Sequence, residues 1–600
     1  MKTKYLFIII SILGFTSCDV ESGINDSGNN DNSIIGGVEE VVSVTSNLTV
    51  SLSTDKAFYA PGETVIFNAD NVPQGAMIRY RADGLTVEEQ KASSTSWTWT
   101  VPQKDFQDYL VEIYTVKDNL SEIIHGTIAV DASSDWKRYP RYGFVADFGS
   151  DKLTPGVIED EMDFLNRCHI NGIQFYDWHN KHHWPLGGTR NHLEMVYKDI
   201  ANRDVYTEAI QKYIDVQHKF GMKSIFYNLC YGALDDGAED GVKKEWSLYK
   251  RPEGADQDAH NLPPSWKSSI YLLDPSNSEW QDYLAERNDE VYSNFNFDGF
   301  HVDQLGDRGK RYNAKGQEIN LPSAFSSFLV SMKKRHPDKC LIMNAVGGYA
   351  AKDIAECDKT DFMYNEVWAN QGEFRDLYNI IKANDLYSKD KKNTVFAAYM
   401  NYECSNRDFN LPGVLLTDAV IFALGGSHIE LGDHMLCREY FPNRDVKMSE
   451  SLKAQIIRYY DFMTAYQNLL RGESSTAEIA PGISVVKGTG ARAEIRDWPP
   501  QKGKIITYAK EIDGKKIVHL LNFLSADQTS WRDLKGTMPT PRLVRNLQVK
   551  VKIDREVSRI WLASPDRHAG AAQDLAFQQK EGHIWFTLPS LNYWDMVVIE

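Results

Sequence analysis

The chain has no pair of cysteines at the C-x-x-C spacing, although it contains 7 cysteines in 600 residues. Without such pairs, neither a structural zinc site nor a redox dithiol is predicted, and no metal or cofactor is expected. The six cysteines after Cys18 are scattered along the chain. We expect them to be small buried hydrophobic residues, with one or two disulfides as the open alternative.

Basic residues are also fewer than acidic residues. Lys and Arg total 66 against 83 Asp and Glu, so the formal net charge is −17. A surface of that sign repels polyanions, so nucleic acid is not expected as a partner and a neutral ligand is favoured. Aromatic residues, by contrast, make up 12% of the chain, with 14 Trp and 30 Tyr. Sugar-binding clefts use such rings as flat apolar platforms, although most aromatic residues of a large protein pack in its core.

The apolar run at the N-terminus covers only residues 5–15, which is too short for a membrane-spanning helix. Two lysines precede the run, and small residues lead from it into Cys18, as in a signal peptide. Cleavage directly before a cysteine resembles the bacterial lipoprotein signal. We therefore predict a signal peptide over residues 1–17, an acylated Cys18 and a flexible tether over 18–40. An ordinary secretory signal with an incidental cysteine is the alternative.

This N-terminus implies a location. The protein is expected in a bacterial cell envelope, at the outer membrane, the cell surface or the periplasmic face. Two acyl chains suffice for stable attachment, so the lipid anchor is the only membrane contact that we expect.

Three blocks of different character follow the tether. Residues 41–135 contain short alternating strands separated by turns, which favours an immunoglobulin-like β-sandwich. Residues 476–600 are rich in β-strand patterns again, for example over 505–509 and 516–523, and indicate a second antiparallel sandwich.

The middle block, residues 136–475, alternates apolar strand-like runs with helical stretches such as 205–220 and 323–335. This alternation favours a (β/α)₈ TIM barrel. A doubly wound sheet is the alternative, but no Gly-rich phosphate loop follows the first strand of that block.

Two of the apolar runs in the middle block have an acidic residue at or near their C-terminal end. Asp303 ends the run 298–303 and precedes the amide Gln304, and Glu366 lies between Tyr364 and Trp368. Polar residues at the ends of barrel strands belong at the rim, where these folds keep their active sites. Two acids are the minimum for glycoside hydrolysis.

The surroundings of the two acids suggest different roles. A carboxylate that accepts hydrogen bonds stays ionised, so Asp303 could attack an anomeric carbon as the nucleophile. Aromatic neighbours raise the pKa of a carboxyl group, which suits Glu366 as the general acid/base. A structural salt bridge is the alternative for either acid alone, and Asp307 is an alternative nucleophile.

Further polar and aromatic residues near strand ends are candidates for binding substrate. Adjacent histidines such as His182-His183 point apart and have no third ligand at a suitable spacing, so they indicate hydrogen bonds to sugar hydroxyls rather than a metal site. Core packing or salt bridges are the alternatives for the rings and acids of this set. The candidates are Asp177, Trp178, His183, Asn228, Tyr231, Gln304, Asn344, Trp368 and Glu430.

At these positions the chain resembles glycoside hydrolase family 66, the endo-dextranases and cycloisomaltooligosaccharide glucanotransferases. The resemblance rests on the segments 174–183, 227–233, 298–303 and 365–368, which appear in the order of the family. It implies a (β/α)₈ barrel between an immunoglobulin-like domain and a C-terminal Greek-key β-domain. It also implies that Asp303 is the nucleophile and Glu366 the acid/base of a retaining enzyme that cuts α-1,6-glucosidic bonds. Asp177 would match a further acid near the sugar that is attacked.

The expected function is therefore endo-cleavage of dextran to isomaltooligosaccharides. Cyclising members carry a long carbohydrate-binding insertion in the barrel region, and the span 138–472 leaves no room for one, so hydrolysis is favoured. The alternatives are a cycloisomaltooligosaccharide-forming transglycosylase, another α-glucanase, or a surface lipoprotein that binds glycans without catalysis.

Overall fold

The computed structural model describes residues 43–472, 477–486 and 493–600. These residues form one compact unit, so the boundaries 41–135, 136–475 and 476–600 stay predictions. None of the helices in the described ranges is long and apolar enough to cross a membrane. The predicted signal peptide, Cys18 and the predicted tether lie outside the described residues.

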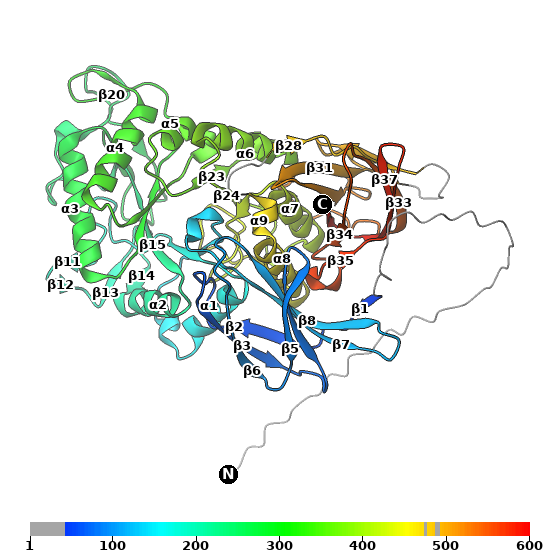
Figure 1. Cartoon of the computed structure of the whole chain (residues 1–600). Coiled ribbons are helices and arrows are strands. Elements are labelled where there is room, and N and C mark those ends of the chain that lie inside the picture. The colour runs from blue at the N-terminus through cyan, green and yellow to red at the C-terminus, as the bar shows by residue number, and fades with distance from the viewer. Residues whose placement is uncertain (1–42, 473–476, 487–492) are drawn as a thin grey trace, which may run out of the picture. The chain divides into compact units, whose positions relative to one another are not determined.

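Two β-sheets with a shared core form the N-terminal part (Figure 1). Every second residue of the strand Thr64–Asp70 is buried, so Val65, Phe67 and Ala69 face the core, where Tyr80 and Trp99 stack at 4.4 Å between ring centroids. This alternation is what a half-buried strand requires. The first sheet has the order β1 (Val44–Ser46), β8 (Glu122–Val130), β7 (Tyr109–Val116), β4 (Met77–Ala82) and β5 (Leu85–Lys91), and the second has β2 (Ser51–Thr54), β3 (Thr64–Asp70) and β6 (Ser96–Thr100).

A closed ring of eight parallel strands forms the middle part. Five strands pair in one sheet and three in another. Single parallel bridges join the two sheets at Asn344 and Tyr364, and at Phe144 and Gly432. In chain order the strands are β9 (Tyr142–Val145), β10 (Gly172–Phe175), β15 (Lys223–Leu229), β19 (Gly299–Asp303), β22 (Cys340–Met343), β23 (Met363–Val367), β24 (Thr394–Ala398) and β26 (Ser427–His428).

A helix follows each strand of the ring. The helices cover the outer face of the strands, which explains why the strand sequences are continuous apolar runs. Polar caps start several of these helices; Asn277, for example, accepts hydrogen bonds from the backbone N–H groups of Glu279 and Trp280. The helices are α1 (Val157–Arg167), α2 (Thr207–Lys219), α3 (Ser278–Asn294), α4 (Leu321–Arg335), α5 (Ala351–Glu356), α6 (Phe374–Ser388), α7 (Leu411–Ala423) and α8 (Glu450–Ala465), and α9 (Gln467–Leu470) follows the last of them.

Loops at the carboxyl ends of the strands carry small strands of their own. The long connections after β10 and β15 hold most of them, and these loops wall the cavity described below. The small strands are β11 (Gly188–Thr189), β12 (His192–Leu193), β13 (Val196–Lys198), β14 (Asp204–Tyr206), β16 (Gly232–Ala233), β17 (Ala259–His260), β18 (Ile270–Leu272), β20 (Arg311–Tyr312), β21 (Glu318–Ile319), β25 (Arg407–Asp408) and β27 (Val446–Lys447).

The C-terminal part again has two sheets around one apolar core, which includes Val518, Leu520, Val549 and Ile584. Most of its pairings are antiparallel, and β31 pairs with β32 over eight residues. One sheet contains β28 (Ala477–Ile479), β30 (Ile495–Asp497), β31 (Ile505–Ile512), β32 (Lys515–Asn522), β38 (Trp594–Ile599), β34 (Ile560–Ala563) and β35 (Gln573–Asp574), and the other contains β29 (Ile483–Val485), β33 (Val544–Lys552), β37 (His583–Leu591) and β36 (Phe577–Lys580).

Candidate active site

A cavity of about 710 Å³ opens at the carboxyl ends of the ring strands. Its size is within the usual range for small-molecule sites, roughly 300–1,000 Å³. Carboxylates, aromatic rings and a few aliphatic side chains line it. The lining residues are Tyr176, Asp177, His182, Ile200, Tyr227, Leu229, His260, Leu262, Pro263, Trp266, Ile270, Asp303, Gln304, Leu305, Val346, Glu366, Trp368, Glu439 and Tyr440.

One amide group bridges two carboxyl groups in this cavity. Asn344 Nδ2 donates to Asp303 Oδ1 at 2.9 Å and to Glu366 Oε2 at 3.2 Å. The two oxygens therefore lie no farther apart than the sum of these hydrogen bonds, roughly 6 Å, which fits a retaining pair at about 5–5.5 Å better than an inverting pair at about 6.5–9.5 Å. The order of the strands explains the arrangement, since Asn344 follows β22, which pairs with β19 and borders β23.

The second oxygen of each of these two carboxyl groups accepts a hydrogen bond from a tyrosine. Tyr227 Oη donates to Asp303 Oδ2 and Tyr399 Oη donates to Glu366 Oε1, both at 2.7 Å. Burial raises the pKa of Asp303, and the hydrogen bonds from Tyr227 and Asn344 oppose that rise. Burial, and then the charge of Asp303, raise the pKa of Glu366 to about 7. The pKa of both carboxyl groups is thus raised; the hydrogen bonds limit the rise at Asp303, and Glu366 is the group that can hold a proton near neutrality.

The interior of the ring below the two carboxyl groups is packed and aromatic. His301 lies edge-on to Tyr364 at 4.6 Å between ring centroids, and its Nδ1 is 3.3 Å from Tyr142 Oη. Burial lowers the pKa of His301 to about 3, so this floor carries no charge near neutrality.

A third carboxyl group, that of Asp177, faces the same cavity two residues after the end of β10. Its backbone has φ of 48°, in the left-handed region that few non-glycine residues adopt. Burial raises its pKa to about 7; Arg203 opposes the rise, and the charges of Asp199 and Asp303 add to it. A strained buried acid at a strand end indicates a functional position.

Aromatic rings stand at the upper wall of the cavity. Trp266 and Tyr440 contact each other at 5.8 Å between ring centroids, and Trp368 contacts Tyr399 at 5.6 Å. Trp266 belongs to the loop between β17 and β18, and Tyr440 to the loop after β26. Such rings can cover the apolar faces of sugars.

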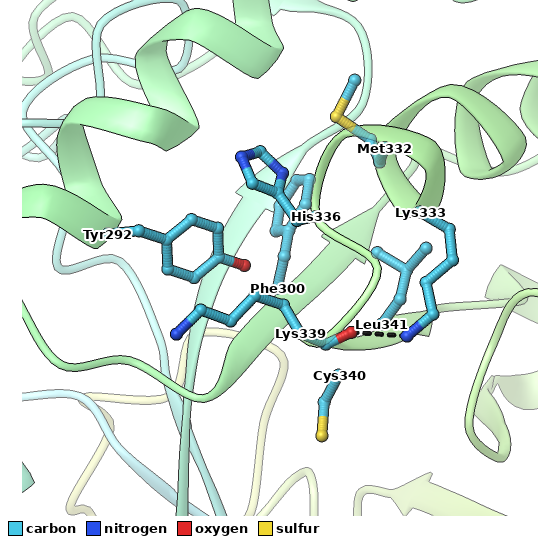
Figure 2. A pocket seen from close by; sticks show the side chains of 8 residues that line it. All are labelled: Tyr292, Phe300, Met332, Lys333, His336, Lys339, Cys340 and Leu341. Carbon is cyan, nitrogen blue, oxygen red and sulfur yellow. Dashed lines mark hydrogen bonds between the residues drawn. The ribbon is translucent and has the colours of Figure 1, made fainter.

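A second hollow lies at the other end of the ring strands (Figure 2). Tyr292, His336, Lys339 and Leu341 are among its lining residues, and Lys333 Nζ donates to the Lys339 carbonyl at 2.6 Å. Its volume of about 10 Å³ corresponds to about one water molecule, so it does not accommodate a sugar.

The family model described as glycosyl hydrolase family 66 matches residues 54–598 of this chain. The chain belongs to glycosyl hydrolase family 66. Membership of this family makes the protein a glycoside hydrolase.

Relatives of this family 66 enzyme carry two names. A cycloisomaltooligosaccharide glucanotransferase of Niallia circulans is 26% identical over an alignment 711 residues long with its gaps, and the alignment covers 91% of this chain and 71% of that protein. A dextranase of Streptococcus salivarius is 24% identical over 574 residues, covering 82% of this chain and 67% of the relative. In structure, the chain is similar to a cycloisomaltooligosaccharide glucanotransferase of Paenibacillus sp., crystallised with cycloisomaltoheptaose. That likeness has a TM-score of 0.83 and 25% identity, and covers 92% of this chain and 100% of the other.

The structure of the family 66 chain brings together several of the residues selected from the sequence. Asp303, Glu366, Asp177, Gln304 and Trp368 all line the cavity. The predicted substrate-binding residue Asn344 is 5% exposed and contacts the two carboxyl groups. The alternative nucleophile Asp307 is exposed outside the cavity, where its Oδ1 accepts from the backbone of Gly309.

Two rings predicted to stack on sugars lie in the core instead, so that prediction is wrong. Trp178 is fully buried, packs against Phe297 at 5.3 Å and donates from Nε1 to the carbonyl of Tyr227. Tyr231 is also fully buried, and its hydroxyl accepts the backbone N–H of Leu305 at 2.9 Å. Each follows a ring strand, but its ring points into the packed layer around the strands.

Three polar candidates are also buried away from the cavity, so direct contact of their side chains with substrate was predicted wrongly. His183 bonds Asp240 at 2.9 Å, and Asn228 Nδ2 donates to the carbonyl of His182 at 2.8 Å. Glu430 is 1% exposed and accepts from Tyr460 Oη at 3.1 Å. Of the two adjacent histidines it is His182 that lines the cavity.

Sequence reasoning missed Trp266, Tyr440 and Tyr399. Trp266 and Tyr440 lie on loops without periodic patterns, so no local signal marks them. Tyr399 directly follows the apolar run Thr394–Ala398, as Asn344 follows Cys340–Met343. Asn344 was selected as a polar residue at the end of an apolar run, and the same criterion would have selected Tyr399.

Proposed function

We propose that this family 66 enzyme is a retaining endo-hydrolase that cleaves internal α-1,6-glucosidic bonds of dextran. The observation that carries the proposal is the carboxyl pair of Asp303 and Glu366, bridged by the Asn344 amide in the large cavity. In this proposal the ring of eight parallel strands is a (β/α)₈ barrel, flanked by an immunoglobulin-like and a Greek-key β-domain.

The first half of the reaction is a displacement at the anomeric carbon. Asp303, kept ionised by the hydrogen bonds from Tyr227 and Asn344, attacks that carbon and forms a glycosyl ester. Glu366 gives its proton to the glycosidic oxygen as the bond to the leaving chain breaks. Its raised pKa supplies that proton near neutrality.

The second half releases the sugar. Glu366, now ionised, takes a proton from water, and the hydroxide attacks the anomeric carbon of the ester. The carboxylate of Asp303 leaves. Two inversions restore the α configuration.

Hydrolysis is supported over cyclisation by the span 138–472, which leaves no room for a long insertion in the barrel region. The alignment with the Niallia circulans glucanotransferase is 711 residues long with its gaps, which exceeds the 600 residues of this chain. That relative therefore contains segments with no counterpart here. The likeness to glucanotransferases keeps intramolecular transfer to a sugar hydroxyl as the second candidate reaction.

Product analysis on dextran tests the proposal. Endo-cleavage predicts an early fall in viscosity and isomaltooligosaccharides before free glucose, with Asp303→Ala as the inactive control. Cyclic products without new reducing ends would favour the glucanotransferase reaction. Glucose as the sole early product would contradict endo action, and activity on starch or pullulan but not on dextran would contradict the substrate.

We also propose that the protein is anchored in the bacterial cell envelope through acylated Cys18. The support is the sequence pattern of residues 1–18 alone. A polymer such as dextran is too large to cross an outer membrane, so an enzyme that cuts it has to act outside or in the periplasm.

A further inference from the structure

Three ionisable side chains converge outside the cavity, between the last strand of the ring and its helices. Asp418 comes from α7, His428 ends β26, and Glu430 follows two residues later. They are 0%, 3% and 1% exposed. One nitrogen or oxygen of each lies within 4.8 Å of the others. The proposed catalytic steps use none of them.

The imidazole of His428 is oriented by a backbone carbonyl. Its Nε2 is 3.0 Å from the carbonyl oxygen of Ala398, which only accepts, so Nε2 carries a hydrogen. Its Nδ1 therefore faces the carboxyl groups, 3.0 Å from Asp418 Oδ1 and 3.5 Å from Glu430 Oε2. A histidine that binds a metal through one nitrogen usually donates from the other to such a carbonyl.

Two carboxyl oxygens in this cluster receive no hydrogen bond from another side chain or the backbone, and the two carboxyl groups lie within hydrogen-bond reach of each other. The two oxygens are Asp418 Oδ2 and Glu430 Oε2, both buried, whereas Glu430 Oε1 accepts from Tyr460 Oη at 3.1 Å. Leaving buried carboxylate oxygens unpaired costs several kcal/mol unless a cation or a proton compensates. Among the described residues, His428 is the only basic side chain in ion-pair contact with either acid.

A second cluster shows how this chain neutralises buried acids elsewhere. His183 lies beside Asp236 and Asp240, which resembles the first cluster in composition. There, however, Lys181 Nζ contacts Asp236 at 2.5 Å and Asp240 at 2.7 Å and supplies the positive charge. No lysine in the described part of the chain has that role in the cluster around His428.

We propose that Asp418, His428 and Glu430 bind one divalent transition-metal ion, of the class of Zn²⁺ or Mn²⁺. One imidazole nitrogen and two carboxylates suit these ions better than Ca²⁺, which takes oxygen ligands. The two carboxylates and Nδ1 offer up to five donor atoms, so the shell can close without water. The ion would fasten β26 to α7 where the ring closes, and thus stabilise the fold rather than take part in the reaction.

Metal analysis of the full chain tests this site independently of the proposed function. We expect about one ion per chain by inductively coupled plasma mass spectrometry. After unfolding in guanidinium with a chelator, refolding with Zn²⁺ or with Mn²⁺ should give a higher Tm than refolding with the chelator present. Failure to hydrolyse dextran would leave this result unaffected.

A proton shared between the carboxyl groups of Asp418 and Glu430 is the rival explanation for their close approach. Variants that replace either acid by its neutral amide distinguish a bound metal ion from such a proton. Asp418→Asn and Glu430→Gln should lose the bound ion and the response of Tm to metal. The control Asp240→Asn, in the cluster that Lys181 neutralises, should keep both. If the wild-type protein contains no ion, and its Tm does not respond to Zn²⁺ or Mn²⁺ after refolding, the proposal is wrong. This measurement does not depend on whether the variants fold.

Discussion

Removing the Asn344 side chain should lower catalytic activity, because this one amide donates hydrogen bonds to both carboxyl groups. The change Asn344→Ala deletes the donor at 2.9 Å from Asp303 and 3.2 Å from Glu366. A hydrogen bond to a charged group is worth about 1.5–3 kcal/mol, and about 1.4 kcal/mol corresponds to a factor of ten in rate. Loss of one such bond in the transition state therefore predicts that kcat/KM falls roughly 10- to 150-fold.

The pH profile gives a second readout of the same change. In the proposed mechanism, activity requires an ionised Asp303, so we expect activity to fall as the pH drops through the pKa of that group. It also requires a protonated Glu366, so it falls as the pH rises above the pKa of about 7. The amide of Asn344 favours the ionised form of both groups. Its removal raises both pKa values, and both limbs of the profile should move to higher pH.

The assay is the pH dependence of kcat/KM on dextran, with Tm measured for each variant. Asn522→Ala is the matched control, because this buried asparagine donates to the Arg542 carbonyl in the C-terminal sheets. The control should lose stability and keep its pH profile. If Asn344→Ala folds, retains its rate within about twofold and keeps both limbs in place, the coupling argument is wrong.

Three further predictions concern the mechanism, the cavity wall and the anchor. Asp303→Ala should abolish turnover, whereas azide should partly restore Glu366→Ala, because only proton transfer is missing there; no effect of azide would argue against the acid/base role. Trp266→Ala should raise KM for dextran roughly 2- to 12-fold by loss of ring contacts worth about 0.5–1.5 kcal/mol, whereas Trp178→Ala should lower the free energy of unfolding by about 3–5 kcal/mol, seen in denaturant titration. Equal KM effects of the two changes would contradict the assignment of Trp178 to the core. Cys18→Ala should release the protein from the membrane fraction, and unchanged fractionation would count against lipidation.

The placement of two carboxyl groups at one rim could be predicted from sequence because strand ends are local features. Asp303 and Glu366 belong to apolar runs that become β19 and β23, and parallel strands deliver their carboxyl ends to one rim. The same rule found Asn344. The strand β9 (Tyr142–Val145), the first of the ring, depends on long-range contacts, namely its pairing with β10 and the bridge from Phe144 to Gly432.

Side-chain direction and loop position could not be predicted in the same way. Asp177 and Trp178 are neighbours after β10, yet one faces the cavity and the other the core. The left-handed backbone of Asp177 interrupts the regular alternation of a strand there. Trp266 reaches the wall from a loop whose path depends on tertiary contacts, including that of its ring with Tyr440. Such contacts leave no periodic pattern in the sequence.

The stereochemistry of the first products tests the central claim most directly. Proton NMR during early hydrolysis of dextran reports the anomeric configuration of the new reducing ends before mutarotation. The bridged pair of Asp303 and Glu366, no farther apart than roughly 6 Å between the bridged oxygens, predicts two displacements and hence α reducing ends first. If β reducing ends appear first, a single displacement by water operates, and Asp303 is not the nucleophile.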